Sequence, residues 1–156
     1  MADRNDARRA VTTAQVVALS MIALTPIYAG LGIALVAGKL GVKMNLTPLT
    51  GPAAQWLSLA LLVAGGGAVF ASFVIRRAMI AQVQGGADTI QQRMRIAIVG
   101  LAIAEAAALM GLVLALLTSE LTFPCLLWGI SLLASLAHFP SRAWLEGTPG
   151  GETSDG

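Results

Sequence analysis

Charged residues are scarce in this sequence. They make up 12% of its 156 residues, whereas a soluble globular domain averages about a quarter. The single cysteine, Cys125, excludes an internal disulfide and a cysteine-based metal cluster, and the single histidine, His138, has no second histidine with which to bind a metal. The chain has too few charges to cover a soluble surface, and no metal site is expected.

Basic residues are few and dispersed. The chain carries 10 Lys and Arg against 8 Asp and Glu, a formal net charge of +2, and the basic residues flank apolar segments. A nucleic-acid surface needs a basic patch or stripe, so no nucleic-acid partner is expected. No nucleophile with an adjacent base, no P-loop and no dinucleotide motif is present, so the sequence predicts neither an enzyme nor a cofactor.

Hydrophobic residues are abundant, at 56% of the chain with a mean hydropathy of +0.78. The first apolar segment has no charge between Arg9 and Lys39, which makes it too long for a signal-peptide core of about 7–15 residues. A helix needs about 20 apolar residues to cross a bilayer core. The four apolar segments lie at about 10–40, 55–74, 96–117 and 121–139. We predict one domain, an all-α polytopic membrane protein with a bundle of four transmembrane helices.

The basic residues predict the topology, because Lys and Arg are enriched in cytoplasmic loops. One side of the membrane would hold Arg4, Arg8, Arg9, Arg76, Arg77, Arg93, Arg95 and Arg142, and the other Lys39 and Lys43. We therefore expect a multi-pass protein of the cell (inner) membrane, with residues 1–9 as a cytoplasmic tail, 10–140 as the membrane domain and 141–156 as a disordered cytoplasmic tail. Only Thr118-Ser119-Glu120 separates the last two segments, which predicts a tight hairpin.

One carboxylate interrupts the third segment, GLAIAEAAALMGLVLALL, which spans residues 100–117. Glu105 is the tenth residue after the segment begins at Ile96, which places it about 13–14 Å into a core about 30 Å thick. An ionised side chain there costs at least about 2.5–3.5 kcal/mol. Two interpretations stay open: Glu105 binds and releases an ion, or it is a protonated group that hydrogen-bonds a neighbouring helix.

Small residues accompany Glu105. At about 100° per residue, four of them share one narrow stripe, which lets another helix approach closely: Gly100, Ala104, Ala108 and Gly111. If the second and third segments form a hairpin, three glycines lie level with the carboxylate: Gly65, Gly66 and Gly67. These glycines would bring backbone, and with it water, close to Glu105; ordinary close helix packing is the alternative interpretation.

The Glu105 segment resembles the carboxylate-bearing helix of the c-type proteolipids of rotary ATP synthases. Gly100, Leu101, Ala102, Ala104, Glu105 and Ala106 match that family's pattern in order, and residues 57–117 have its layout of a glycine-containing helix, a basic loop and a glutamate helix. The resemblance implies that Glu105 binds and releases a proton or sodium ion in a ring of subunits. The chain departs from the pattern at Phe73 and Arg77, where the family has small residues, and in its first and fourth segments.

Other polar residues lie within the apolar segments. Thr25 and Pro26 interrupt the first segment, where a kink is the expected consequence and a polar lining the alternative. Ser131 and Ser135 share one face of the fourth segment; we expect them to bond their own helix backbone, with a bond to Glu105 as the alternative. His138 is expected to lie at the membrane interface.

Two functions follow from these observations. The first is a proteolipid-like subunit that translocates protons or sodium ions with Glu105. The second is a small four-helix membrane protein with an assembly, structural or interaction role and no transport. The expected partners in either case are the lipid bilayer and other membrane subunits or further copies of the chain.

Overall fold

The computed structural model describes residues 2–38, 48–83 and 89–146. This part of the chain is helical and contains no strand, which confirms the all-α prediction. The helices are α1 (Ala2–Val36), α2 (Pro52–Ala81), α3 (Thr89–Thr118), α4 (Thr122–Ala137) and the short α5 (Arg142–Glu146). Residues 39–47, with Lys39 and Lys43, and residues 84–88 lie outside the described part of the chain.

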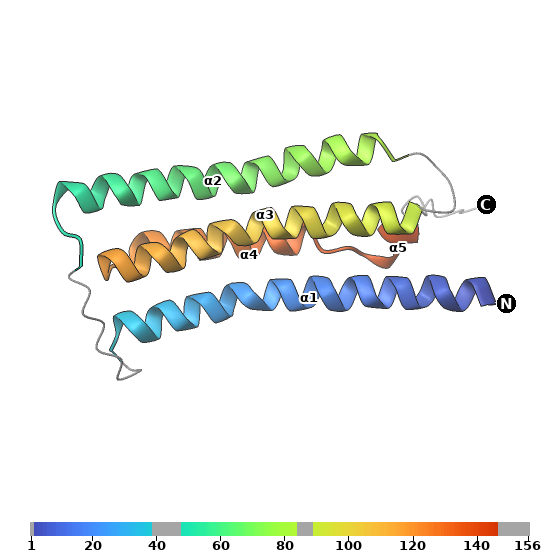
Figure 1. Ribbon diagram of the computed structural model, residues 1–156, viewed down its shortest axis with the longest axis horizontal. Helices are drawn as coiled ribbons and strands as arrows, with labels where there is room; N and C mark the ends of the chain where they lie inside the picture. Colours follow the sequence, from blue (N-terminus) through green and yellow to red (C-terminus); the bar gives the residue numbers. More distant parts are fainter. Residues whose placement is uncertain (1, 39–47, 84–88, 147–156) are drawn as a thin grey trace, which may run out of the picture.

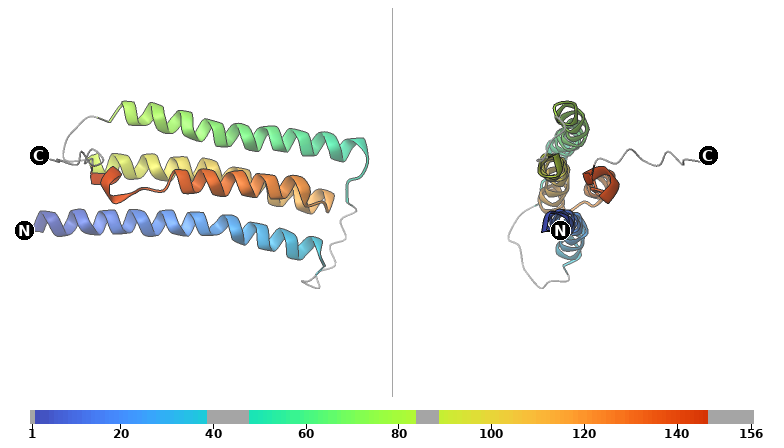
Figure 2. Two further views of the ribbon diagram at one scale, coloured as in Figure 1. Left: turned by 180° about the vertical axis from the view of Figure 1, so that it is seen from behind. Right: turned by 90° about the vertical axis from the view of Figure 1, so that its right-hand side faces the viewer.

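Helix α3 lies at the centre of the bundle and contacts each of the other four helices (Figure 1). Helices α1 and α2 lie on opposite sides of α3, and the end-on view shows the three in a row with α4 beside them (Figure 2). One face of α3 therefore packs against α4, while Leu109 and Val113, each 46% exposed, point away from the bundle. Alanine and glycine dominate the buried surface of α3, so its neighbours can approach closely.

Three helices, α1, α2 and α3, are long and apolar enough to cross a membrane. Their outer surfaces, and that of α4, are apolar as well: Trp56 and Phe70 are each 71% exposed and Leu133 is 68% exposed. Exposed apolar side chains on this scale fit lipid rather than water. The fourth predicted span, α4, has 16 residues, or about 24 Å, which is shorter than a bilayer core of about 30 Å.

The α3–α4 hairpin is as tight as the sequence predicts. Helix α3 ends at Thr118 and α4 begins at Thr122. The Thr118 hydroxyl donates to the Leu114 carbonyl at 2.9 Å and accepts from the Glu120 amide at 3.3 Å. Between them Ser119 adopts a positive φ of 54°, which reverses the chain within three residues.

Both predicted tails include helical residues. Helix α1 begins at Ala2, so residues 2–9, predicted as a cytoplasmic tail, are continuous with the helix that follows. The region predicted to be disordered from residue 141 begins with α5, whose Leu145 is fully buried against Val11 and Ala14 of α1. An apolar side chain with a docking surface on α1 orders this segment, and the sequence alone does not show that surface. Residues 147–156 lie outside the described chain.

Candidate functional site: a buried carboxylate between three helices

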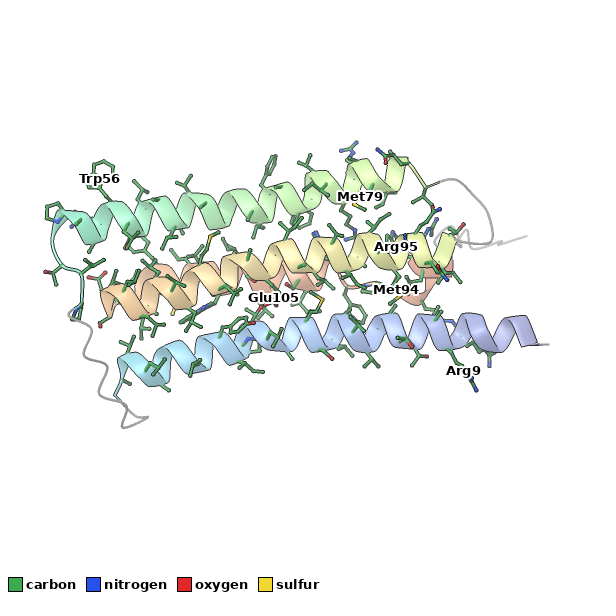
Figure 3. The ribbon with its side chains drawn as sticks, viewed as in Figure 1. Arg9, Trp56, Met79, Met94, Arg95 and Glu105 are labelled. Carbon is green, nitrogen blue, oxygen red and sulfur yellow. The ribbon has the colours of Figure 1, made fainter. Side chains whose placement is uncertain are left out.

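Glu105 lies near the middle of the bundle, on the side of α3 that faces α1 (Figure 3). Its side chain is only 6% exposed. The hydroxyl of Thr25, on α1, is 1% exposed and donates a hydrogen bond to Glu105 Oε1 at 2.9 Å. The polar lining considered for Thr25 is therefore present, and Pro26 lies inside a helix that continues past it.

A second hydroxyl brings α4 into the same cluster. Ser131 Oγ donates to the carbonyl of Ala104 at 2.9 Å, and it lies 3.4 Å from Thr25 Oγ1. Each hydroxyl has one proton. With Thr25 donating to Glu105 and Ser131 donating to Ala104, no proton remains for the contact between the two hydroxyls, which agrees with its length. The expectation that Ser131 bonds its own helix is wrong; it joins α4 to α3 instead.

The second carboxylate oxygen, Glu105 Oε2, is buried and has no hydrogen-bond partner among the described residues. An ionised carboxylate in this position would leave an uncompensated charge in an apolar core, whereas a proton on Oε2 removes that charge. The cluster of Glu105, Thr25 and Ser131 thus presents one protonatable group, held by one hydroxyl from α1 and approached by a second from α4.

The predicted stripe of small residues lies against α4. A Cβ added at Gly100 would fall 2.2 Å from the ring of His138, and one added at Gly111 would fall 2.8 Å from Trp128 Nε1. The Trp128 indole also donates to the Ala108 carbonyl at 3.1 Å, and the Ala104 carbonyl accepts from Ser131. Bulkier residues on the stripe would push α4 away from α3, so the stripe sets how closely α4 covers Glu105.

The glycine triplet does not line the carboxylate. A Cβ added at Gly65 would meet Leu127 at 2.5 Å and Ala107 at 3.6 Å, while at Gly66 and Gly67 it would meet nothing within 4 Å. These glycines lie on α2, across α3 from Thr25 and α1 (Figure 1). Counting residues along the two helices placed the triplet at about the depth of Glu105, since Gly65 lies near Ala107. Such counting does not show which face of α3 carries the Glu105 side chain.

His138, expected at the membrane interface, is buried within the bundle. It follows α4, is fully buried, and packs edge-on against Phe73 with 4.5 Å between the ring centroids. Close to it, Arg76 donates to the carbonyl of Ala137 at 2.8 Å and lies 5.0 Å from the ring centroid of Trp144 in α5. The two departures from the proteolipid pattern thus differ in their surroundings: Phe73 packs on this histidine, and Arg77 is exposed.

Near α5, the arginines gather at one end of the bundle, which we call the arginine-rich end. Its described members are Arg8, Arg9, Arg76, Arg77, Arg93, Arg95 and Arg142. Arg93 donates to the Trp144 carbonyl, and its guanidinium lies 5.8 Å from the centroid of the Trp144 ring. The start of α1 and α5 both lie at this end, whereas Trp56 marks the opposite end (Figures 1 and 3).

Fold and site together define an all-helical protein with three helices able to cross a membrane and one carboxylate buried where α1, α3 and α4 meet. Among the described residues no group of three His, Cys, Asp or Glu side chains could hold a metal ion. Comparison with protein-family models, with curated proteins and with solved structures gave no match to this chain. Thr25 and Ser131, which the site requires, had one signal in the sequence: each is a polar residue at mid-depth in an apolar segment.

Proposed function

We propose that this protein translocates protons across a membrane and that Glu105 is the group that binds and releases them, as the resemblance to c-type proteolipids implies. The observation that supports this most directly is the unpartnered Glu105 Oε2, buried between three helices of the same chain. A group that exchanges a proton needs an apolar setting that keeps charge rare and a free position where the proton binds. Glu105 has both.

A purely structural role does not require an acid at this position. The bond from Thr25 to Glu105 Oε1 needs only an acceptor, which the amide oxygen of glutamine would supply without the cost of an ionisable group. An acid adds the ability to gain and lose a proton. The unpartnered Oε2 contributes nothing to packing, yet it is the atom at which a proton would bind.

The proposal includes a difference from a simple ring subunit. Helices α1 and α4 enclose Glu105 within its own chain, so the proton would reach it inside the bundle rather than at a surface passed between subunits. We place α4 in the membrane as the fourth span, and both termini in the cytoplasm, because the arginine-rich end collects most of the basic residues. The exposed apolar face of α2 is left for lipid or for other subunits.

The alternative function is structural, and one observation favours it. The bond from Thr25 to Glu105 joins residues 80 apart in the sequence and holds α1 against α3. A membrane protein of this size can use one such bond to fix the arrangement of its helices, at about 0.6 kcal/mol on average in the membrane. In that case the acid acts as an acceptor and never needs to ionise.

Glu105→Gln separates the two functions. The purified protein is reconstituted into liposomes, a potential is imposed, and proton entry is followed with an internal pH dye. We expect Gln to abolish proton entry while the helix content and resistance to unfolding stay close to wild type. Proton entry that persists in Glu105→Gln at the wild-type rate would rule out the carrier role, and a large loss of stability in Glu105→Leu alone would then support the structural one.

A chemical label provides an independent measurement. Carbodiimides react with protonated carboxyls in apolar surroundings, so they should modify Glu105 in preference to Glu120, which is exposed. Protection of Glu105 by sodium ions but not by potassium ions would change the transported ion from a proton to sodium. Equal labelling of both glutamates would contradict the dry, protonated site.

Assembly and topology are tested separately. Native mass in mild detergent should show a homo-oligomer if the chain forms a ring, and a monomer or a small complex if it acts within one bundle. In a Cys125→Ser background, Thr50→Cys should react with an impermeant thiol reagent from outside the cell and Gln82→Cys should not, because the two lie at opposite ends of the bundle. The reverse labelling would invert the proposed orientation.

A further inference from the structure

The buried polar atoms that have no partner share one place in the fold. Among the described residues they are Glu105 Oε2, Ser135 Oγ and the two ring nitrogens of His138. Glu105 lies where α1, α3 and α4 meet, and Ser135 and His138 follow Ser131 toward the end of α4, where His138 lies beside Gly100 of α3. Buried polar groups in folded proteins are nearly always paired with protein or ordered water, so a set of unpaired groups in one column requires an explanation.

From the Glu105 site, a column of buried polar residues formed by Ser131, Ser135 and His138 extends toward one end of the bundle. Ser131, Ser135 and His138 stand at positions i, i+4 and i+7 of one chain segment, which puts them on one face, and each is 0% exposed. Ser131 lies 3.4 Å from the Thr25 hydroxyl that donates to Glu105, and His138 lies beside Gly100, five residues before Glu105 on α3. From Ser131 to His138 the column extends about 10 Å along the axis. It ends beside Arg76, at the arginine-rich end of the bundle.

Beyond Glu105 in the other direction the same helix contact is apolar. Trp128 fills the space between α1 and α3: a Cβ at Gly32 would lie 2.7 Å from its ring, and one at Gly111 would lie 2.8 Å from its indole nitrogen. The indole N–H is used by the Ala108 carbonyl. Leu114 and Ala115 continue this contact with no exposed surface and no side-chain hydrogen-bonding group. Among the described residues, the buried side-chain atoms without a hydrogen-bond partner therefore lie at Glu105 and on one side of it only.

We propose that Ser131, Ser135 and His138, with water molecules between them, form a proton path that connects Glu105 to the arginine-rich end of the bundle. This inference rests on the proposed function of Glu105 and adds the route and the side from which the proton arrives. At each hydroxyl or water the oxygen forms a covalent bond to the arriving proton and releases its own proton to the next group. The histidine takes a proton on one ring nitrogen and gives one from the other, so each proton that enters the column releases one at the next group.

The serines are better suited to this path than to packing. Ser58, a buried serine on α2, bonds the Ala54 carbonyl of its own helix at 2.8 Å, as serines in helices commonly do. Ser135 is equally buried but makes no such bond, so its hydroxyl remains free to donate and to accept. An alanine would fill the same space with no unpaired group, which means that packing gives no reason for the hydroxyl.

Hydrogen–deuterium exchange at Glu105 tests the path. The protein in lipid is transferred to heavy water, and the carbonyl stretch of the protonated Glu105 side chain is followed by infrared spectroscopy, with Glu105→Gln to identify the band. Ser135→Ala and His138→Asn should each slow the exchange by about tenfold or more, because each removes a group that passes the proton. Ser58→Ala is the matched control and should exchange at the wild-type rate.

The possible results of these experiments test the proton path and the carrier role of Glu105 separately. Wild-type exchange rates in both Ser135→Ala and His138→Asn would overturn the path, and Glu105→Gln would still decide the carrier role by proton entry into liposomes. Slow exchange in both variants, in a protein that passes no protons in liposomes, would support the path and overturn the carrier role. If His138→Asn loses helix content, Ser135→Ala decides alone, since it removes a single atom that makes no contact needed for folding.

Discussion

The two halves of the α3–α4 contact differ in chemistry although they are built from the same kind of small-residue helix. On one side of Glu105, in what we call the Trp128 half, Trp128 and Leu127 pack on Ala108 and Gly111. On the other side, in what we call the His138 half, Ser131, Ser135 and His138 face Gly100 and Ala104. In the Trp128 half the indole N–H has a partner, the Ala108 carbonyl, whereas the buried side-chain atoms without a partner among the described residues are in the His138 half and at Glu105.

This difference teaches how a carboxylate can be reached from one end of a bundle. In a membrane, apolar packing and satisfied hydrogen bonds exclude water, and unsatisfied buried polar groups attract it. The Trp128 half has the apolar packing that excludes water, and the His138 half has the unsatisfied polar groups that attract it. A change that disturbs packing in the Trp128 half should therefore lower the free energy of unfolding strongly. The loss of a hydroxyl in the His138 half should change that free energy little but slow proton exchange at Glu105.

The largest effect is expected from Trp128→Ala. The substitution removes a ring that packs between Gly32 and Gly111, along with a hydrogen bond to Ala108, and should lower the free energy of unfolding by about 3 kcal/mol. Unfolding in detergent, followed by far-ultraviolet circular dichroism, measures it. Trp56→Ala, at a position 71% exposed, is the control and should change little. Equal losses in the two variants would mean that Trp128 has no special role in the contact.

Gly100→Ala should have the next largest effect. Its new methyl group would fall 2.2 Å from the ring of His138, which is held between α3 and Phe73. Overpacking of this kind costs about 1–3 kcal/mol. The same unfolding measurement applies, and a shift of the His138 ring resonances in nuclear magnetic resonance spectra should accompany it. No change in either quantity would show that His138 moves freely, which contradicts a closely packed His138 half.

Ser131→Ala and Ser135→Ala form a pair that sharpens the comparison further. Ser131 loses a bond to the Ala104 carbonyl on α3, so its variant should be less stable by about 0.6 kcal/mol, the average for bonds between membrane helices. Ser135 loses a hydroxyl with no partner, so its variant should be as stable as wild type or slightly more stable. The two are compared in one unfolding experiment; a larger loss for Ser135 than for Ser131 would reverse the assignment of their bonds.

A small effect of the opposite sign is expected on α2. A Cβ at Gly67 would meet nothing within 4 Å, so Gly67→Ala should raise the free energy of unfolding by about 0.5–1 kcal/mol through the better helix propensity of alanine. Gly65→Ala, whose Cβ would lie 2.5 Å from Leu127, should instead be neutral or destabilising. The same detergent unfolding measures both variants. Equal changes in unfolding free energy at both positions would mean that the neighbouring Leu127 does not restrict a side chain at Gly65.

Much of the architecture could be predicted because it depends on local properties of the chain. Long uncharged runs predict helices long enough for a membrane, and the three residues Thr118, Ser119 and Glu120 between two apolar segments predict a hairpin. The position of Gly100 and Ala104 one turn apart predicts a face suited to close packing. The short helix α5 could not be predicted in this way, because Leu145 packs against Val11 and Ala14, which are more than a hundred residues away in the sequence.

The sequence by itself determined that Glu105 is a single carboxylate at mid-depth in an apolar helix, because depth along a helix follows from a fixed rise per residue. Only the tertiary structure decided what meets that carboxylate. Thr25 and Ser131 reach it, and Gly66 and Gly67 do not, because the neighbour of a side chain depends on how the helices are rotated and ordered around α3. That order is a property of the packed bundle as a whole. Hydropathy identifies the helices that are able to cross a membrane, and the packing of the bundle decides which polar groups share its interior.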